Sequence, residues 1–304
     1  MKEWQDILRE WKQHRSESMA LATLVRATGS SYRRPGARML VSGDGKMVGG
    51  LSGGCLEEEV AESSAEVIAS TCPKLMSFDT RRRFGCDGRI DVLIELVRND
   101  LFAEVAAQTM ARQSCTACTD FDLQGEKVGT RLLNCGEPEE EQTLIQIITP
   151  PLRLIIVGHG PENTALCAIA SVLGWEVVEV EHEFQIPFSF DDWTEVIVKT
   201  HNYGRDFATL QSLLPRGLRY LGLVSSRTRR EQLLADLFDS QPIGDLFAPA
   251  GLDLAADTPE QIALAIAAEI HCVFAEGTGQ RLRDRKTPIH RRQSRALSCE
   301  RLVQ

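Results

Sequence analysis

The chain has 304 residues, and 43% of them are hydrophobic, which is enough for two ordinary domains and excludes a disordered chain. It carries 34 Lys and Arg against 43 Asp and Glu, and the net charge of −9 argues against a nucleic-acid-binding protein. No apolar run reaches the roughly 18 residues of a membrane span, and no apolar signal region follows the N-terminus. We therefore expect a cytoplasmic protein that binds neither nucleic acid nor a membrane. Its nine cysteines are scattered, as in a chain without a disulfide framework.

The first half of the chain predicts a small α+β domain. An amphipathic helix opens it, with Trp4, Ile7, Leu8 and Trp11 on one face. The expected strands lie at 19–26, 37–42, 90–97, 116–123, 130–134 and 144–148, and two further helices lie at 57–69 and 101–112. Pro150-Pro151 interrupts this pattern, so we place the first domain at 1–149.

The second half predicts a Rossmann-like domain at 150–276. Its expected strands lie at 152–157, 177–180, 195–199 and 220–224, and helices follow them up to 173, at 205–214 and at 227–238. Alternating strands and helices indicate a doubly wound parallel sheet with right-handed crossovers. Thr258 and Gln261 predict a capping box for a last helix that runs to Phe274. Residues 281–301 hold eight basic and two acidic residues, so we interpret 277–304 as a flexible tail, with docking to an acidic partner as the alternative.

The sharpest chemical motif is Ser52, Gly53, Gly54 and Cys55, which runs directly into a predicted helix. Glycines free the backbone, and exposed N–H groups at the start of a helix stabilise anions and lower the pKa of a thiol. Cys55 is therefore a candidate thiolate, either a soft metal ligand or a sulfur-handling group. A small buried residue beneath a tight turn is the alternative.

A second cysteine has a similar setting. Cys86 lies between Gly85 and Gly88 and is a candidate for the same pocket, with a purely structural thiol as the alternative. Cys115 and Cys118 have the spacing of a redox motif, but no strand–helix junction surrounds them. We interpret that pair as incidental.

A basic loop at 28–36 follows the first strand. Its candidate ligands are Ser30, Ser31, Arg33 and Arg34, with Arg38 two residues beyond. Guanidinium forks and hydroxyl groups match the geometry of phosphate. We expect these residues to hold anionic groups, and a solvated basic loop is the alternative.

The turn Gly158, His159 and Gly160 stands between a buried strand and a helix, as in dinucleotide-binding domains. Glu181 ends the next strand, where an acid can hold a ribose hydroxyl. The pattern is incomplete, because Asn163 replaces the third glycine. A turn that binds no nucleotide, with His159 as a plain turn residue, is the alternative.

With these motifs the chain resembles the xanthine dehydrogenase accessory factors, the XdhC/CoxI family. The resemblance covers most of residues 19–275. It rests on Leu21-Ala-Thr23, Gly29-Ser-Ser31, Arg34-Pro-Gly-Ala37, Ser52-Gly-Gly-Cys-Leu-Glu57, Leu173-Gly174, Thr200-His201, Tyr220-Leu-Gly-Leu223, Ser226-Arg227, Ala248-Pro249, Gly251-Leu-Asp253, Thr258-Pro-Glu260 and Ala268-Glu-Ile270.

The resemblance implies a chaperone for the molybdenum cofactor, built from a small N-terminal domain and a Rossmann-like domain. Such a protein protects the cofactor, supports its sulfuration by a cysteine desulfurase and inserts it into a xanthine dehydrogenase-type molybdenum hydroxylase. The cargo would be molybdopterin-bound molybdenum or a dinucleotide form of it, and the chaperone would be a homodimer. Cys55 would be the thiol nearest the molybdenum, and Cys86 its second.

Three departures from the family pattern concern the glycine motifs. The usual Gly-Ala-Gly-His is Gly158-His-Gly-Pro161, the usual Asp-x-Arg is Glu181-His-Glu183, and the usual Gly-Cys-Gly-Gly is Gly85-Cys-Asp-Gly88. The first two put nucleotide binding in question, whereas the Cys55 motif is intact. We therefore expect a carrier rather than an enzyme, in which a thiolate of the first domain faces the glycine turn of the second.

Two other functions compete with this interpretation. The first is an NAD(P)-dependent oxidoreductase with a diverged turn, which rests on Gly158, Gly160 and Glu181 alone. The second is a sulfur- or selenium-transfer protein that carries a persulfide on Cys55.

Overall fold

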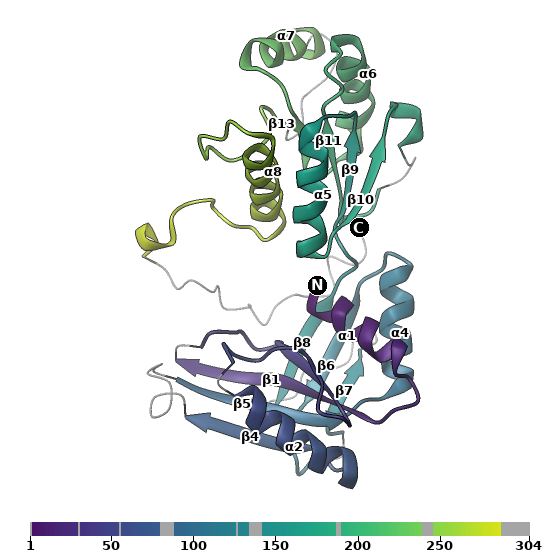
Figure 1. The fold of residues 1–304 in the computed structure, drawn as a ribbon, viewed down its shortest axis with the longest axis vertical. Helices are drawn as coiled ribbons and strands as arrows, with labels where there is room; N and C mark the ends of the chain where they lie inside the picture. The colour runs from purple at the N-terminus through teal and green to yellow at the C-terminus, as the bar shows by residue number, and fades with distance from the viewer. Residues whose placement is uncertain are drawn as a thin grey trace. The chain divides into compact units, whose positions relative to one another are not determined.

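The structure, a computed structural model, describes residues 2–29, 31–54, 56–79, 88–125, 127–133, 142–186, 190–238 and 246–286. These residues form two compact units, an N-terminal unit that ends at Pro150 and a C-terminal unit that begins at Pro151 (Figure 1). No helix in the described part of the chain is long and apolar enough to cross a membrane.

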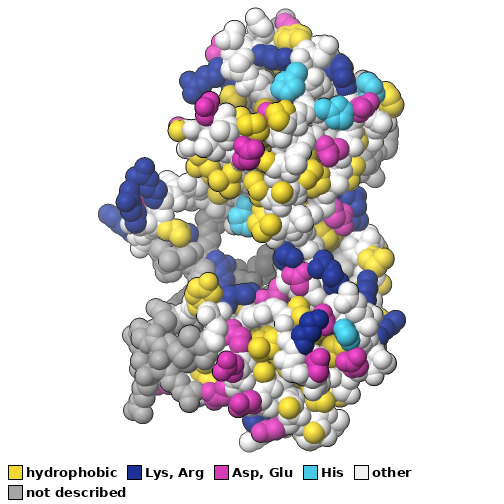
Figure 2. All heavy atoms as spheres, viewed as in Figure 1, with side chains coloured by type: hydrophobic (Ala, Val, Ile, Leu, Met, Phe, Trp, Pro, Cys, Tyr) yellow, Lys and Arg dark blue, Asp and Glu magenta, His cyan; other side chains and the backbone are white. Residues whose placement is uncertain are grey.

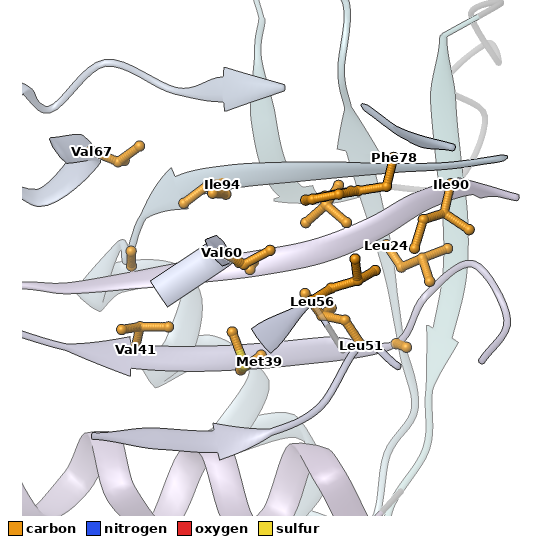
Figure 3. Packing of buried hydrophobic residues seen from close by; sticks show 14 residues of the cluster. Leu24, Met39, Val41, Leu51, Leu56, Val60, Val67, Phe78, Ile90 and Ile94 are labelled. Atoms are coloured by element: carbon orange, nitrogen blue, oxygen red, sulfur yellow. The ribbon is translucent and has the colours of Figure 1, made fainter. Parts of the chain in front are cut away.

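A five-stranded antiparallel sheet forms the centre of the N-terminal unit. In chain order its strands are β1 (Met19–Gly29), β2 (Arg38–Ser42), β3 (Met47–Gly49), β4 (Lys74–Asp79) and β5 (Gly88–Leu96), and they lie in the order β3-β2-β1-β5-β4. One face packs on helix α2 (Glu57–Ser70), where Leu24, Met39 and Val60 are fully buried (Figure 3). The strand β4 was not predicted from the sequence, because it is an edge strand with few buried residues.

The other face of this sheet is covered by helices α1 (Lys2–Gln13) and α4 (Asn99–Met110) and by a small sheet in the order β7-β6-β8. The small sheet consists of β6 (Cys115–Asp120), β7 (Gly129–Leu132) and β8 (Thr143–Ile148). The predicted apolar face of α1 is confirmed, because Trp4 and Trp11 both contact Phe102 edge to face with ring centroids 5.7 Å apart. Aromatic pairs in this geometry add stability beyond the buried area.

Three connections leave the same end of the five-stranded sheet. Gly29 at the end of β1 pairs with Gly88 at the start of β5, and β4 ends beside them at Asp79. Because β2 runs antiparallel to both β1 and β3, its start at Arg38 lies toward this end, as does the end of β3 at Gly49. The basic loop at 28–36, which we call the anion loop, and the connections that carry the Cys55 and Cys86 motifs therefore leave the sheet at the same end.

The C-terminal unit contains a parallel sheet in the order β10-β9-β11-β12-β13. Its strands are β9 (Arg153–Val157), β10 (Glu176–Val180), β11 (Thr194–Val198), β12 (Leu221–Leu223) and β13 (Leu246–Phe247). Helices α5 (Pro161–Leu173) and α8 (Pro259–Phe274) cover one face, and α6 (Tyr203–Leu213) and α7 (Arg227–Phe238) cover the other. The doubly wound Rossmann-like prediction is confirmed, although the two-residue strand β13 was missed.

The remaining short elements are 3-10 turns, η1 (Glu183–Gln185), η2 (Leu214–Arg216) and η3 (Leu282–Asp284). The predicted capping box of α8 is present, because the Thr258 hydroxyl accepts a hydrogen bond from the N–H of Gln261, whose side chain accepts one from the N–H of Thr258. In the predicted basic tail, residues 287–304 lie outside the described residues.

Candidate functional site

The Ser52–Glu57 loop is anchored at both ends in the core of the N-terminal unit. Leu51 and Leu56 are 0% and 1% exposed, and both point into the cluster around Leu24 (Figure 3). Between them Gly53 and Gly54 are exposed, and Gly54 has a φ of +105°, which other residues rarely adopt. Cys55 lies outside the described residues, so the position of its thiol stays a prediction.

The carboxylate of Glu57, which sequence reasoning missed, holds this loop together. Its Oε1 accepts hydrogen bonds from the N–H groups of Leu51 at 3.1 Å and Ser52 at 2.7 Å. Its Oε2 accepts from the Ser52 hydroxyl at 2.7 Å and from the N–H of Leu56 at 3.1 Å. Burial raises the pKa of Glu57, but these hydrogen bonds outweigh burial and hold the pKa below its usual value. A carboxylate two residues after the cysteine was the available signal.

The start of α2 is rich in acidic residues. Glu57, Glu58 and Glu59 all lie in the first turn of the helix. Carboxylates at this position are stabilised by the positive end of the helix dipole. They already balance that end, so the helix offers less stabilisation to a further anion than an uncharged first turn would.

The anion loop is tied to helix α1. Arg33 donates a hydrogen bond to Glu3 at 2.6 Å, and the Ser31 hydroxyl donates to the main-chain oxygen of Arg33 at 2.6 Å. Arg34 is exposed, so its guanidinium group is open to a ligand. Ser30 lies outside the described residues, and its predicted role stays a prediction.

Arg38 lies inside the N-terminal unit rather than on its surface, with 0% exposure. Its guanidinium donates to the main-chain oxygen of Gly36 at 3.0 Å and to Gln146, and it stacks on Trp4 at 4.8 Å from the ring centroid. Burial lowers the pKa of Arg38 to about 10, while the carboxylates of Glu95 and Glu3 raise it. We therefore leave Arg38 out of the proposed ligand set.

Two exposed arginines, which the sequence analysis did not single out, lie on the β1–β5 pair toward the same end of the sheet. Arg26 and Arg89 flank Asp91, with nitrogen–oxygen distances of 3.5 and 3.6 Å. Their side chains are 48% and 63% exposed, so water weakens both ion pairs and leaves the guanidinium groups accessible. Cys86, in the connection just before Arg89, lies outside the described residues.

The predicted glycine turn of the C-terminal unit packs tightly against the end of β11. Gly158 has a φ of +108°, and a Cβ there would lie 2.6 Å from the main-chain oxygen of Lys199. A Cβ on Gly160 would lie 2.5 Å from the Lys199 ammonium nitrogen. Packing against the main chain therefore explains Gly158, whereas the atoms nearest to Gly160 are the ends of the Lys199 and Glu162 side chains.

A buried ion pair, also missed from the sequence, lies beneath this turn. Lys199 is 1% exposed, and its Nζ lies 2.7 Å from Oε2 of Glu162 and 2.6 Å from Oδ1 of Asn163. The Asn163 amide donates to the main-chain oxygen of Gly158 and to Glu179. Burial raises the pKa of Glu162, but the hydrogen bonds from Lys199 and the main chain, together with the charges of Lys199 and His201, outweigh burial and lower the pKa. The carboxylate of Glu162 thus already supplies an anion at the start of α5.

Glu181 and His159, both predicted ligand contacts, contact each other. His159 Nε2 lies 3.0 Å from Glu181 Oε1, and the two side chains are 65% and 62% exposed. Arg205 donates to the main-chain oxygen of Glu181. The structure brings these two predicted residues together with Gly158 and Gly160 at the carboxyl end of the parallel sheet, where ligands of open α/β sheets bind.

Both units match known protein families. Residues 13–79 match the XdhC and CoxI family, and residues 154–270 match the XdhC Rossmann domain. A probable xanthine dehydrogenase subunit of Bacillus subtilis (strain 168) is 27% identical, over 84% of this chain and 92% of that protein. The molybdenum cofactor insertion chaperone PaoD of Escherichia coli (strain K12) is 26% identical, over 83% of this chain and 82% of that protein. A crystal structure described as a xanthine dehydrogenase from Bacillus halodurans is 26% identical with a TM-score of 0.81, over 91% of this chain and 97% of that one.

Proposed function

The chain belongs to the XdhC and CoxI family, and from that premise we propose that it is a maturation factor that binds the molybdenum cofactor and delivers it to a molybdenum hydroxylase. The observation that carries the proposal is the similarity, over more than four fifths of the chain, to both a molybdenum cofactor insertion chaperone and a probable xanthine dehydrogenase subunit. The client would be an enzyme of the xanthine dehydrogenase type.

The proposed binding region is the loop-bearing end of the N-terminal sheet. Molybdenum held by sulfur is a soft centre that suits a cysteine thiol, and we assign this contact to Cys55, with Cys86 as a second thiol. The terminal phosphate of the cargo suits exposed guanidinium groups, which Arg34, Arg26 and Arg89 supply. Each charge-assisted hydrogen bond contributes roughly 1.5–3 kcal/mol, so a few of them hold a cargo firmly and still release it.

The finer steps of this function are part of the proposal. While bound, the cofactor would receive its terminal sulfur from a cysteine desulfurase before transfer, and the cargo would be the molybdopterin form or a dinucleotide form. Assembly as a homodimer is also proposed. One large exposed apolar side chain on each of α5 and α8, Val172 at 74% and Leu264 at 52%, supports such a contact, and hydrophobic side chains gather over these helices in Figure 2.

Metal and pterin analysis tests the proposed function. The protein is purified from a host that makes the cofactor, and molybdenum and pterin are measured per chain. We expect both in the wild type and a loss of at least about tenfold in Cys55→Ala, because one ligand contact of this strength is worth roughly a factor of ten. Cys72→Ala, an exposed cysteine of the same unit, is the matched control. A wild type without molybdenum and pterin would refute the proposal.

The nicotinamide-dependent alternative has less support. The carboxylate of Glu162 in the first turn of α5 would repel a pyrophosphate at the glycine turn, and Asn163 stands where close helix packing needs glycine. Calorimetry with NAD(H) distinguishes this function. The sulfur-transfer alternative predicts a persulfide on Cys55 after incubation with a desulfurase and a sulfur donor, which intact-mass spectrometry detects.

A further inference from the structure

The carboxylate of Glu57 accepts hydrogen bonds from both ends of the segment between residues 51 and 56. Glu57 accepts hydrogen bonds from Leu51 and Ser52 on one side of Cys55 and from Leu56 on the other. The described residues on both sides of position 55 are therefore held by the same carboxylate. The N–H of Gly54 donates a further hydrogen bond within this segment, to the Ser52 hydroxyl at 3.3 Å.

The physical need for this acceptor comes from burial. Leu51 and Leu56 are buried, so their N–H groups cannot turn to bulk water if the carboxylate is removed. The exposed glycines between them have no Cβ to restrict the backbone, and no described neighbour lies within 4 Å of either Cβ position to hold them in place. Without Glu57 the loop would keep its two leucine anchors and lose its defined path between them.

We propose that Glu57 is a positioning residue, whose carboxylate fixes the chain at Ser52 and at Leu56, on either side of position 55 in the sequence, and that cargo binding through Cys55 depends on this carboxylate. The part of this proposal that concerns cargo binding, its cargo half, rests on the proposed function. The part that concerns the loop, its loop half, does not. Glu57 itself has its oxygens committed to the loop and makes no contact with the cargo.

Glu58 provides a matched control. It follows Glu57 directly in the first turn of α2 and carries the same charge, but its side chain is exposed and holds none of the described loop residues. Glu57→Gln and Glu58→Gln therefore change the charge at the start of the helix equally. Only the first removes half of the acceptor that the loop uses.

Hydrogen exchange read by mass spectrometry or NMR tests the loop half without any cargo. In Glu57→Gln the amides of Leu51, Ser52 and Leu56 should exchange at least about tenfold faster than in the wild type, since a bond to a charged acceptor is worth that factor or more. In Glu58→Gln they should exchange as in the wild type. Unchanged exchange at these amides in Glu57→Gln would overturn the proposal even if the protein carries no molybdenum.

Release of the molybdenum cofactor tests the cargo half. We expect the release rate to rise in the order wild type, Glu57→Gln, Glu57→Ala, because the amide keeps one acceptor oxygen and alanine keeps none. In both Glu57 variants the melting temperature of the C-terminal unit should stay at the wild-type value. In Glu58→Gln the rate of cofactor release should also stay at the wild-type value. If the wild type binds cofactor and Cys55→Ala loses it while both Glu57 variants retain it, then Glu57 does not position the site and the proposed function still stands. If the wild type binds none, the proposed function fails and the exchange experiment alone decides on Glu57.

Discussion

Replacing Glu195 with glutamine should stabilise the protein above neutral pH. Glu195 lies on β11 with 0% exposure, where burial raises its pKa from 4.5 to about 8, and Arg219 and the main chain of Tyr220 lower the pKa only in part. Between these two values the folded state keeps a proton that the unfolded state releases. The free energy of unfolding of the wild type therefore falls as the pH rises through this window.

The magnitude follows from the width of the window. One pKa unit corresponds to about 1.4 kcal/mol, so a pKa of about 8 gives an upper limit of about 5 kcal/mol for the destabilisation above pH 8. Because the protein relaxes around a buried charge and glutamine leaves a buried amide, we expect Glu195→Gln to gain about 2–3 kcal/mol near pH 8.5. Near pH 5 the two proteins should differ by less than about 1 kcal/mol.

Urea unfolding between pH 5 and pH 9 measures this effect, with hydrogen exchange of the β11 amides as a probe specific to the C-terminal unit. Glu231→Gln on the exposed surface of α7 is the control for removal of one negative charge. A difference between wild type and Glu195→Gln that stays constant across this pH range would refute the reasoning, as would a glutamine variant that is less stable than the wild type near pH 8.5.

Three further substitutions test the contacts described above. Gly158→Ala should destabilise the protein by about 3 kcal/mol, because its Cβ would clash with the Lys199 main chain, whereas Gly53→Ala should lie within about 0.5 kcal/mol of the wild type; thermal unfolding compares the two. Lys199→Met should cost about 3 kcal/mol by leaving Glu162 unpaired, and the added change Glu162→Gln should restore most of it in a double-mutant cycle; strict additivity would contradict the ion pair. Arg38→Leu should cost about 2–3 kcal/mol in urea unfolding, since the main-chain oxygen of Gly36 and the Gln146 side chain lose a charged donor and Trp4 loses its stacking partner, and a neutral outcome would contradict the buried role.

The regular parts of the fold could be predicted because they depend on local pattern. The alternation of strands and helices after residue 151 gave the doubly wound sheet, and Thr258 with Gln261 gave the start of α8. The strands β4 and β13 could not be predicted in the same way, since one is a half-exposed edge and the other has two residues. Their pairing depends on neighbours that are distant in sequence.

Some residues of the candidate site could likewise be predicted from local sequence, and others could not. The motif around Cys55 and the glycine turn at Gly158 are visible as sequence, because glycines mark positions where the backbone needs freedom. The roles of Glu57 and Lys199 are not visible, since a glutamate in a helix and a lysine after a strand are ordinary until their partners are known. Arg38 shows the converse: its neighbours in sequence are the residues of a surface loop, but both faces of β2 are covered, which buries the guanidinium.

The common end of the five-stranded sheet lies where the paired strands, which need a defined sequence pattern, give way to connections, which do not. Strand pairing is complete within the ladders of β1 to β5, and it does not depend on the length of the connections that leave this end. Insertions or substitutions in those connections would leave the strand pairing intact, because loops that connect strand ends tolerate such changes far better than paired strands do. The same five-stranded scaffold can therefore carry connections of different length and chemistry.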